Sequence, residues 1–438
     1  MSYLDDWYAV VARNIGGGSN KRFFHQGYGD MVAASKLYSE VIGAVTRGET
    51  KPLQVVWGDL ERSEPSVFSG CLGSGQRFTP TFQEASFESP AASYLPPVSQ
   101  QGKFLFVWRV GTDGSPTPPP TKIAVHLPTT GDQFYWFRKQ IALDLLKHDI
   151  ASVILMFPYY STRKPHHQYA HILPSVASFI TQISAGVTES AGIALWTDKE
   201  FPNCTVVFTG VSLGGSVANV AAIVAAAGLE NGEKRVGSAP VVATSSATSF
   251  LTGVLHSRIA WDVLAAAPGD CADALKQVLE EDHSGKETAE ESKQTLTLEN
   301  GKPLNEAETK LAETMECLSL PKIVRLMSNR RHELNLEMPK LGSVVQVSAS
   351  GDRFVGKHQS ELFGTLREVC TESSCERRDI TGGHISTLLP SKRSEVIVPA
   401  IVEAFEKLNS GQREEGNGRD ATVTAAPMSA AQAQGMRV

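Results

Sequence analysis

Short apolar runs alternate with longer helical stretches through the middle of the chain. Runs at residues 104–110, 122–127, 151–157, 204–211 and 344–348 have the length of buried strands and are rich in Val, Ile and Phe. Strands separated by helices are typical of parallel sheets, because each parallel connection must return to the starting end of the sheet. The pattern predicts an α/β fold with a mostly parallel central sheet and helices on both faces.

The same pattern divides the chain into three parts. We expect an N-terminal helical arm and irregular segment at 1–84, a main domain at 85–410, and a disordered tail at 411–438, since the tail has no apolar period. Within the main domain the strands stop at about 262–338, where a highly charged stretch precedes a short helix. We predict a partly disordered lid-type insertion there; a solvent loop with no role toward substrate is the alternative.

One strand leads directly into a turn that carries a serine. Residues 210–214 read Gly-Val-Ser-Leu-Gly, and they stand between the strand at 204–211 and a small-residue helix that continues through 221–228. A serine in this pattern occupies a strained strand-to-helix turn, which the flanking glycines allow to close. We predict an alpha/beta-hydrolase fold with Ser212 as nucleophile; in the alternative, Ser212 only caps the helix.

A serine nucleophile needs a base that takes its proton and an acid that orients the base. In this fold the acid and then the base follow the serine along the chain. Asp352 comes just after the strand at 344–348, and His384 lies on a glycine-rich loop further on. Taken singly, Asp352 is better explained as a turn residue and His384 as a hydrogen-bonded loop histidine. Their joint order favours the triad Ser212, Asp352 and His384, with His358 as the second candidate base.

Two further groups of residues are expected beside Ser212. The oxyanion of an acyl-transfer intermediate needs backbone N–H donors, which we assign to Leu213 and to Thr129 or Thr130, in the turn after the strand at 122–127. The segment after the strand at 151–157 reaches the same edge of the sheet, where open α/β sheets bind ligands. Its candidate substrate-binding residues are Tyr159, Tyr160, Arg163 and Lys164, the last two as contacts for a phosphate. Packed tyrosines and a solvated turn are the alternative.

Linked motifs along the chain give a more specific signal than the serine turn alone. They read His-Leu-Pro-Thr-Thr-Gly-Asp at 126–132, Tyr-Trp at 135–136, Pro-Tyr-Tyr at 158–160, Arg-Lys-Pro at 163–165, Gly-Val-Ser-Leu-Gly-Gly at 210–215, Thr-Gly-Val-Leu at 252–255 and Gly-Gly-His-Ile at 382–385, together with Asp352. Through them the chain resembles the alpha/beta-hydrolase domain-containing 18 family over roughly 85–265 and 340–405. The resemblance implies an intracellular serine hydrolase of lipid acyl esters, with deacylation of phospholipid (cardiolipin) in mitochondria.

Composition and charge limit the kinds of partner that we expect for this protein. The chain has 438 residues, of which 41% are hydrophobic and 20% charged, so it can bury a large core. A net charge of −6 gives no broad basic field, and nucleic acid is therefore not expected as a partner. No run reaches the roughly 18 to 20 apolar residues of a membrane span. An apolar helical stripe at 4–15 leaves peripheral membrane contact open, although such stripes are more often core or docking surface.

Six scattered cysteines without metal-ligand spacing indicate reduced thiols and an intracellular protein. We expect the mitochondrion by family resemblance and the cytosol otherwise, and neither a cofactor nor a metal. The predicted activity is that of a serine carboxylic-ester hydrolase, such as a phospholipid deacylase, working through an acyl-enzyme. One alternative is a catalytically weak pseudoenzyme that binds lipid or a protein partner in the same cleft, because Thr129 stands where the family tends to have glycine. An acyltransferase with the same triad is the other.

Overall fold

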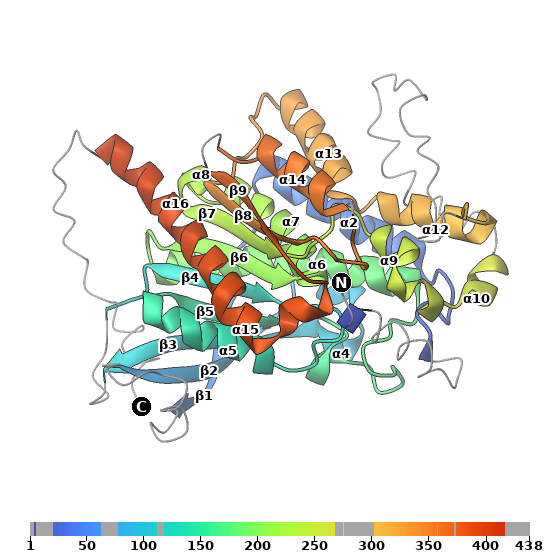
Figure 1. Cartoon of the computed structure of the whole chain (residues 1–438), viewed down its shortest axis with the longest axis horizontal. Helices are drawn as coiled ribbons and strands as arrows, with labels where there is room; N and C mark the ends of the chain where they lie inside the picture. Colours follow the sequence, from blue (N-terminus) through green and yellow to red (C-terminus); the bar gives the residue numbers. More distant parts are fainter. Residues whose placement is uncertain are drawn as a thin grey trace.

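A nine-stranded sheet forms the centre of the computed structural model, which describes residues 4–5, 21–62, 78–111, 118–267, 275, 302–356, 358–371 and 374–416 (Figure 1). The strands in spatial order are β1 (Val56–Arg62), β2 (Phe78–Glu88), β3 (Gln101–Gly111), β5 (Ala151–Met156), β4 (Lys122–Leu127), β6 (Thr205–Val211), β7 (Val236–Val241), β8 (Ser343–Ala349) and β9 (Cys375–Ile380). The strands from β1 to β5 pair antiparallel in this order, and all later neighbours pair parallel. The predicted mostly parallel α/β sheet is confirmed.

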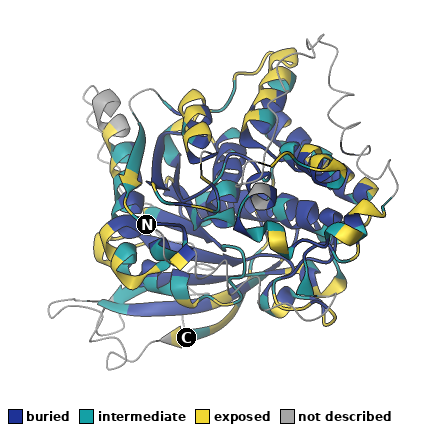
Figure 2. Ribbon diagram, turned by 45° about the vertical axis from the view of Figure 1, so that its right-hand side comes forward, coloured by how far each residue is buried: buried dark blue, intermediate teal, exposed yellow. Residues whose placement is uncertain are grey.

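Helices cover both faces of this sheet (Figure 1). One face carries α2 (Met31–Arg47), α6 (Val176–Glu200) and α7 (Leu213–Gly228), and the other carries α5 (Trp136–Leu145) and α16 (Val398–Gly416). Because both faces are covered, β5, β7 and β8 are buried along their whole length, as the dark blue centre of Figure 2 shows. Strands buried on both faces are mostly apolar, which is why β5 and β8 were predicted from the sequence, whereas β7, which contains Gly237, Ser238 and Pro240, was not.

The remaining described helices connect the strands and the helices named above. They are η2 (Ala92–Tyr94), α4 (Pro97–Gln100), η3 (Leu146–His148), η4 (Ser161–Arg163), α8 (Gly232–Arg235), α9 (Ser249–Thr252), η5 (Val254–Arg258), α10 (Trp261–Ala265), α12 (Glu306–Glu316), α13 (Leu320–Glu333), α14 (His358–Glu368), η7 (Ile385–Leu388), α15 (Pro390–Lys392) and η8 (Arg393–Ile397). None of the described helices combines the length and the apolar character needed to cross a bilayer.

Helix α2 and strands β1 and β2 pack into the main domain, whereas the sequence predicted a helical arm and irregular segment at 1–84. Helix α2 packs against α6 and α7, and its Ile42 and Val45 are at most 1% exposed. Strands β1 and β2 extend the sheet beyond β3, so the sheet begins at Val56 rather than after residue 84. The sequence does not reveal β1 because its register shifts between Trp57 and Leu60, which breaks the two-residue alternation.

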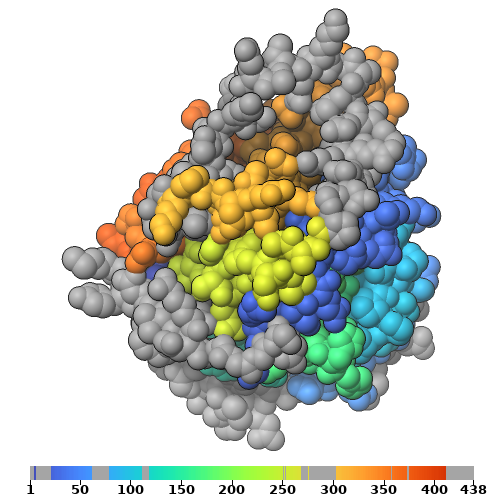
Figure 3. All heavy atoms as spheres, turned by 90° about the vertical axis from the view of Figure 1, so that its right-hand side faces the viewer, coloured from blue at the N-terminus to red at the C-terminus, as the bar shows by residue number. Residues whose placement is uncertain are grey.

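The described part of the interval at 262–338 packs onto the domain. Helix α12 begins with a capping box between Asn305 and Glu308, and its Leu311 and Met315 are fully buried. Helix α13 packs against α2 and α14. In Figure 3 the orange helix α12 lies against the yellow-green segment of α9 and α10. The partly disordered lid-type insertion was expected at about 262–338, and residues 268–301 of that interval, apart from Leu275, lie outside the described residues.

The C-terminal boundary also differs from the expected one. Helix α16 continues through Gly416, beyond the predicted end of the domain at 410. The rest of the predicted disordered tail, residues 417–438, lies outside the described residues.

Candidate active site

Ser212 occupies a strained turn between β6 and α7. Its backbone has φ 56° and ψ −121°, a region that residues with a side chain rarely adopt. The turn is tight on both sides: a Cβ on Gly210 would lie 2.4 Å from the carbonyl carbon of Gly214, and a Cβ on Gly214 would lie 2.5 Å from the carbonyl oxygen of Leu127. Only glycine fits at either place. The N–H of Ser212 donates to the carbonyl of Val241 at 2.9 Å, which anchors the turn to β7.

The order of the strands leaves a crevice at this turn. Strand β4 lies between β5 and β6, and Leu127 at its end pairs with Gly210 of β6. The chain continues from β4 toward β5 on one side and from β6 toward β7 on the other, so the loops after β4 and β6 diverge. Ligands of open α/β sheets bind at such a point, outside the carboxyl ends of the strands.

Asp352 and His384 form a buried hydrogen-bonded pair on the loops after β8 and β9. The Nδ1 of His384 lies 2.8 Å from Oδ2 of Asp352, and the Asp352 side chain is fully buried. The other carboxylate oxygen accepts the backbone N–H groups of Phe354 at 2.8 Å and Val355 at 3.1 Å. With its Nδ1 engaged by the carboxylate, the imidazole is left with Nε2 as the nitrogen that can accept a proton.

Phe354 links this pair to the serine. Its ring stacks on the imidazole of His384, with 4.6 Å between the ring centroids and 22° between the planes. Phe354 and Val355 also line the cavity to which Ser212 belongs. The structure thus brings the three predicted triad residues to one edge of the sheet. The second candidate base, His358, instead pairs with Glu361 at 2.8 Å in the first turn of α14.

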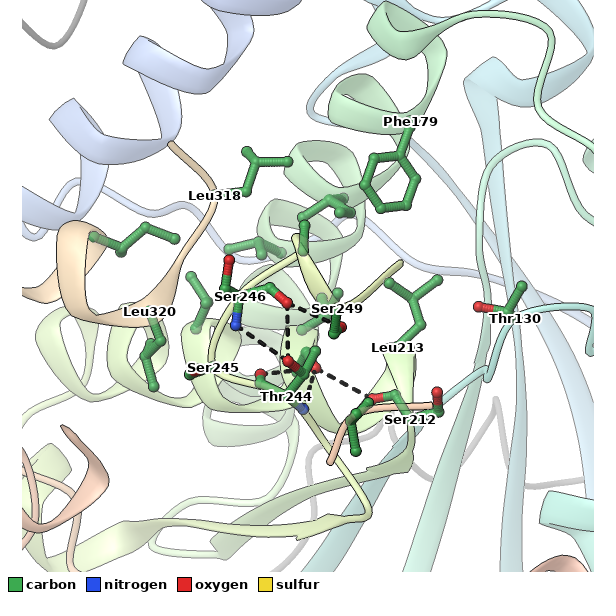
Figure 4. A pocket seen from close by; sticks show the side chains of 18 of the residues that line it. Thr130, Phe179, Ser212, Leu213, Thr244, Ser245, Ser246, Ser249, Leu318 and Leu320 are labelled. Atoms are coloured by element: carbon green, nitrogen blue, oxygen red, sulfur yellow. Dashed lines mark hydrogen bonds between the residues drawn. The ribbon is translucent and has the colours of Figure 1, made fainter. Parts of the chain in front are cut away.

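Of the predicted oxyanion residues, Leu213 and Thr130 line the cavity with Ser212 (Figure 4). Thr129 instead lines a separate small pocket beside Arg138. The turn after β4 is held firmly, because Arg138 donates to Asp132 at 2.7 Å and the N–H of Gly131 donates to the hydroxyl of Tyr160 at 3.3 Å.

The four candidate substrate contacts after β5 are mostly structural. Arg163 is 0% exposed, and its guanidinium donates to both carboxylate oxygens of Glu189, at 2.6 and 2.8 Å, and to backbone carbonyls. The expectation that Arg163 meets a phosphate is therefore wrong. Tyr159 and Tyr160 are also buried, and burial raises the pKa of Tyr159 to about 12. Lys164 is half-buried and donates to the carbonyl of Gln168 at 3.0 Å.

A cavity opens at Ser212 and runs between the helices of one face. The empty space at this site, counted together with the open solvent at its mouth, is about 1020 Å³. Figure 4 shows Leu213 and Thr130 on one side, and Leu318 and Leu320 on the other. Its apolar lining comes from α2, α6, α7, η5, the start of α13 and the loops before α9, before α13 and after β8. It consists of Tyr38, Val41, Ile42, Phe179, Ile183, Val187, Leu213, Val217, Val220, Ala247, Val254, Leu255, Leu318, Leu320, Ile323, Phe354 and Val355.

Two parts of this site carry no signal in the sequence. One is the polar segment 244–249, whose Ser246 lines the cavity and donates its hydroxyl to Glu316 at 2.8 Å. The other is Asp5, whose carboxylate accepts the backbone N–H of His384 at 2.8 Å. The partners are far apart along the chain in both cases, so only the folded structure reveals them. The described residues include no group of His, Cys, Asp or Glu side chains that would hold a metal ion.

Comparison with known proteins gives the family. Among solved structures, the chain is similar to acetyl xylan esterase 1 from Thermoanaerobacterium sp., with 12% identity over 90% of this chain and 98% of that one and a TM-score of 0.40. It is also similar to the rice cell wall degrading esterase LipA from Xanthomonas oryzae, with 14% identity over 84% and 100% of the two chains and a TM-score of 0.41. The family model described as alpha/beta hydrolase domain containing 18 matches residues 21–407. Since this match covers most of the chain, the protein belongs to the alpha/beta hydrolase domain containing 18 family.

Proposed function

We propose that this protein is a serine carboxylic-ester hydrolase that cleaves lipid acyl esters through an acyl-enzyme on Ser212. The observation that carries the proposal is the position of Ser212, in a strained strand-to-helix turn on the wall of a large apolar cavity. Membership of an alpha/beta hydrolase family supports it, as does the buried pair of His384 and Asp352 on the neighbouring loops.

The proposed reaction has two steps. Ser212 Oγ attacks the ester carbonyl while His384 Nε2 takes its proton, and Asp352 holds the imidazole and stabilises its charged form. The backbone N–H groups of Leu213 and Thr130 stabilise the oxyanion, with Thr129 as the second choice for that position. His384 then returns the proton to the leaving alcohol. Water, activated by the same imidazole, hydrolyses the acyl-enzyme and releases a carboxylic acid.

The cavity supports an acyl chain as the group that the site recognises. Its lining is apolar along α2, α6 and α7, and burying one methylene group from water stabilises a complex by about 0.8 kcal/mol. Arg163 cannot bind the phosphate of a headgroup, because its guanidinium is paired with Glu189. A phospholipid of the cardiolipin type as substrate, and the mitochondrion as compartment, rest on the family resemblance.

Two exposed aromatic side chains support contact with a membrane surface. Phe134 is 74% exposed and Trp136 is 67% exposed, and both follow closely after the turn that carries Thr130. Aromatic rings are favoured at the boundary between lipid and water. We propose that these side chains touch a lipid surface beside the turn that carries Thr130.

Labelling with a fluorophosphonate tests the nucleophile. Purified wild-type protein should react covalently, and Ser212→Ala should not, while Ser394→Ala, which removes an exposed serine, should label like the wild type. Incubation with mixed phospholipids that include cardiolipin, beside triacylglycerol, then identifies the substrate by the lipid that is depleted. The released product is analysed in the same samples.

The outcomes separate the alternatives. Free carboxylic acid as product supports a hydrolase, whereas transfer of the acyl group to an added alcohol or thiol supports an acyltransferase. Absence of labelling in well-folded wild-type protein would contradict the proposal and favour a lipid-binding or partner-binding pseudoenzyme. Equal labelling of wild type and Ser212→Ala would assign the reactivity to another residue.

A further inference from the structure

The carboxylate of Asp5 lies against the loop that carries His384. Asp5 Oδ2 accepts the backbone N–H of His384 at 2.8 Å, and Oδ1 accepts that of Ile385 at 2.8 Å. Oδ2 also lies 3.4 Å from the N–H of Arg353, the residue directly after Asp352. Asp5 is 0% exposed. In Figure 1 residues 4–5 form the short dark-blue piece of the chain beside the orange-red segment that leads into α15.

The loop needs such a partner because of its backbone geometry. Gly382 has φ 122°, which is a backbone conformation that favours glycine. The next residue, Gly383, donates its N–H to the hydroxyl of Ser386 at 2.9 Å. His384 directly precedes η7, and the first N–H groups of a helical turn have no carbonyl acceptor within the turn. Asp5 supplies that acceptor from a distant part of the chain, in the manner of an N-terminal capping residue.

A carboxylate suits this position better than the other side chains of its size. It offers two acceptor oxygens and no donor, and each of its oxygens accepts at least one N–H. Asparagine would direct an NH₂ group at one of these N–H groups. Alanine would leave both without a partner inside the protein, where an unpaired polar group is costly.

We propose that Asp5 is a positioning residue of the active site. Its hydrogen bonds connect the loop after Asp352 with the loop that carries His384, and so hold the imidazole in the direction of Ser212. The inference rests on the proposed function, because it assigns Asp5 a task in that reaction. It also makes a segment outside the predicted main domain a part of the site.

The test compares Asp5→Ala and Asp5→Asn with a matched control, Asp30→Ala. Asp30 also caps backbone with its carboxylate, by accepting the N–H of Ala33 at 3.0 Å, but it is exposed and does not line the cavity. A displacement of about 1 Å in a catalytic group costs on the order of 100-fold in rate. We expect both Asp5 variants to lose about 10- to 100-fold in kcat, with KM within about twofold of the wild type. Asp30→Ala should keep wild-type kinetics and lose about 1 kcal/mol of stability.

A second measurement reads the base directly. In protein labelled with ¹⁵N-histidine, the proton on Nδ1 of His384 gives a downfield resonance that reports its hydrogen bond to Asp352. We expect this resonance in the wild type and in Asp30→Ala, and a shifted or broadened one in the Asp5 variants. A folded Asp5 variant with both the wild-type kcat and the wild-type resonance would overturn the proposal.

This design keeps the two proposals distinguishable. Absent labelling of wild-type Ser212 would refute the proposed function, while the resonance still decides whether Asp5 orients His384. Where Asp5→Ala fails to fold, Asp5→Asn carries the comparison, because it keeps the volume of the side chain. A folded Asp5→Asn protein with unchanged kcat and resonance would then overturn the proposal by itself.

Discussion

Replacing Gly214 by alanine tests whether the spacing between β4 and α7 sets the geometry of the site. The added Cβ would lie 2.5 Å from the carbonyl oxygen of Leu127 and 2.9 Å from that of Pro128. Ordinary contacts of a Cβ begin at 3.4 Å, so the two segments would have to separate by about 3.4 − 2.5 = 0.9 Å. Both oxygens belong to the backbone, and no rotation of a side chain relieves the contact.

This separation falls between the two proposed oxyanion donors. Leu213 precedes Gly214 on α7, and Thr130 lies in the turn after Pro128, so moving the segments apart moves the two N–H groups apart. A misplacement of about 1 Å costs on the order of 100-fold in rate, and overpacking a tight contact costs about 1–3 kcal/mol of stability. We expect Gly214→Ala to fold with reduced stability and to lose about 100-fold in kcat/KM and in the rate of fluorophosphonate labelling.

Gly364→Ala is the matched control. Gly364 lies inside α14, and a Cβ at this position would meet nothing within 4 Å. Alanine is favoured over glycine in a helix by about 0.5–1 kcal/mol, so this variant should gain stability and label at the wild-type rate. Both variants are compared by urea denaturation and by labelling kinetics. A folded Gly214→Ala protein that labels as fast as the wild type would refute the reasoning.

Four further predictions concern the cavity, the exposed aromatics, the buried ion pair and a buried histidine. In a series of soluble esters, each added methylene that enters the cavity should raise kcat/KM up to about fourfold, which corresponds to about 0.8 kcal/mol; a flat series would exclude the cavity as the acyl site. Trp136→Ser should reduce sedimentation with phospholipid vesicles and leave the hydrolysis of a short soluble ester unchanged; unchanged sedimentation would remove Trp136 from the membrane contact. Arg163→Met should lower the free energy of unfolding, measured by urea denaturation, by about 3–5 kcal/mol, because it leaves Glu189 charged and unpaired. Lys164→Ala should change it by less than about 0.5 kcal/mol, and equal effects of the two variants would contradict the assignment of Arg163 to a structural ion pair. Burial, with a smaller effect of Arg138, lowers the pKa of His126 to about 3. As the pH falls below about 6.5, this histidine therefore binds a proton in the unfolded chain but stays neutral in the folded protein. At pH 5.5 this difference costs about 1.4 kcal/mol of stability, and His126→Asn should reduce the loss of stability between pH 7.5 and 5.5 by that amount; an unchanged loss would show that His126 does not contribute to it.

The central strands were readable from the sequence for a physical reason. A strand covered by helices on both faces is mostly apolar, and β5 and β6 show this pattern. An edge strand such as β1 pairs with one neighbour only. Strand β1 has a register shift between Trp57 and Leu60 where it pairs with β2, and this irregularity removes the alternation that would have indicated a strand.

Arg163 illustrates a different limit. In the sequence, an arginine and a lysine after an apolar strand are equally compatible with a phosphate contact and with a structural ion pair. The information that decides between them lies on α6, where Glu189 is the only charged residue between 176 and 197. A carboxylate inside an otherwise uncharged, buried helix requires a cation, because a lone buried charge is very costly. Glu189 was therefore the available sign that a basic residue elsewhere is committed to the core.

The residues of the site differ in the same way. Ser212, Asp352 and His384 follow β6, β8 and β9, which are strands of the parallel part of the sheet, and the loops after these strands lie at one edge of it. The hydrogen bonds of Asp5 instead join segments that are far apart in the sequence, because residues 4–5 lie against the loop that carries His384. Local patterns report what a residue's own element requires of it. The hydrogen bond between His384 and Asp5 joins residues 379 positions apart and satisfies a backbone N–H of the loop that carries His384. The positioning role proposed for Asp5 can therefore be recognised only in the folded structure.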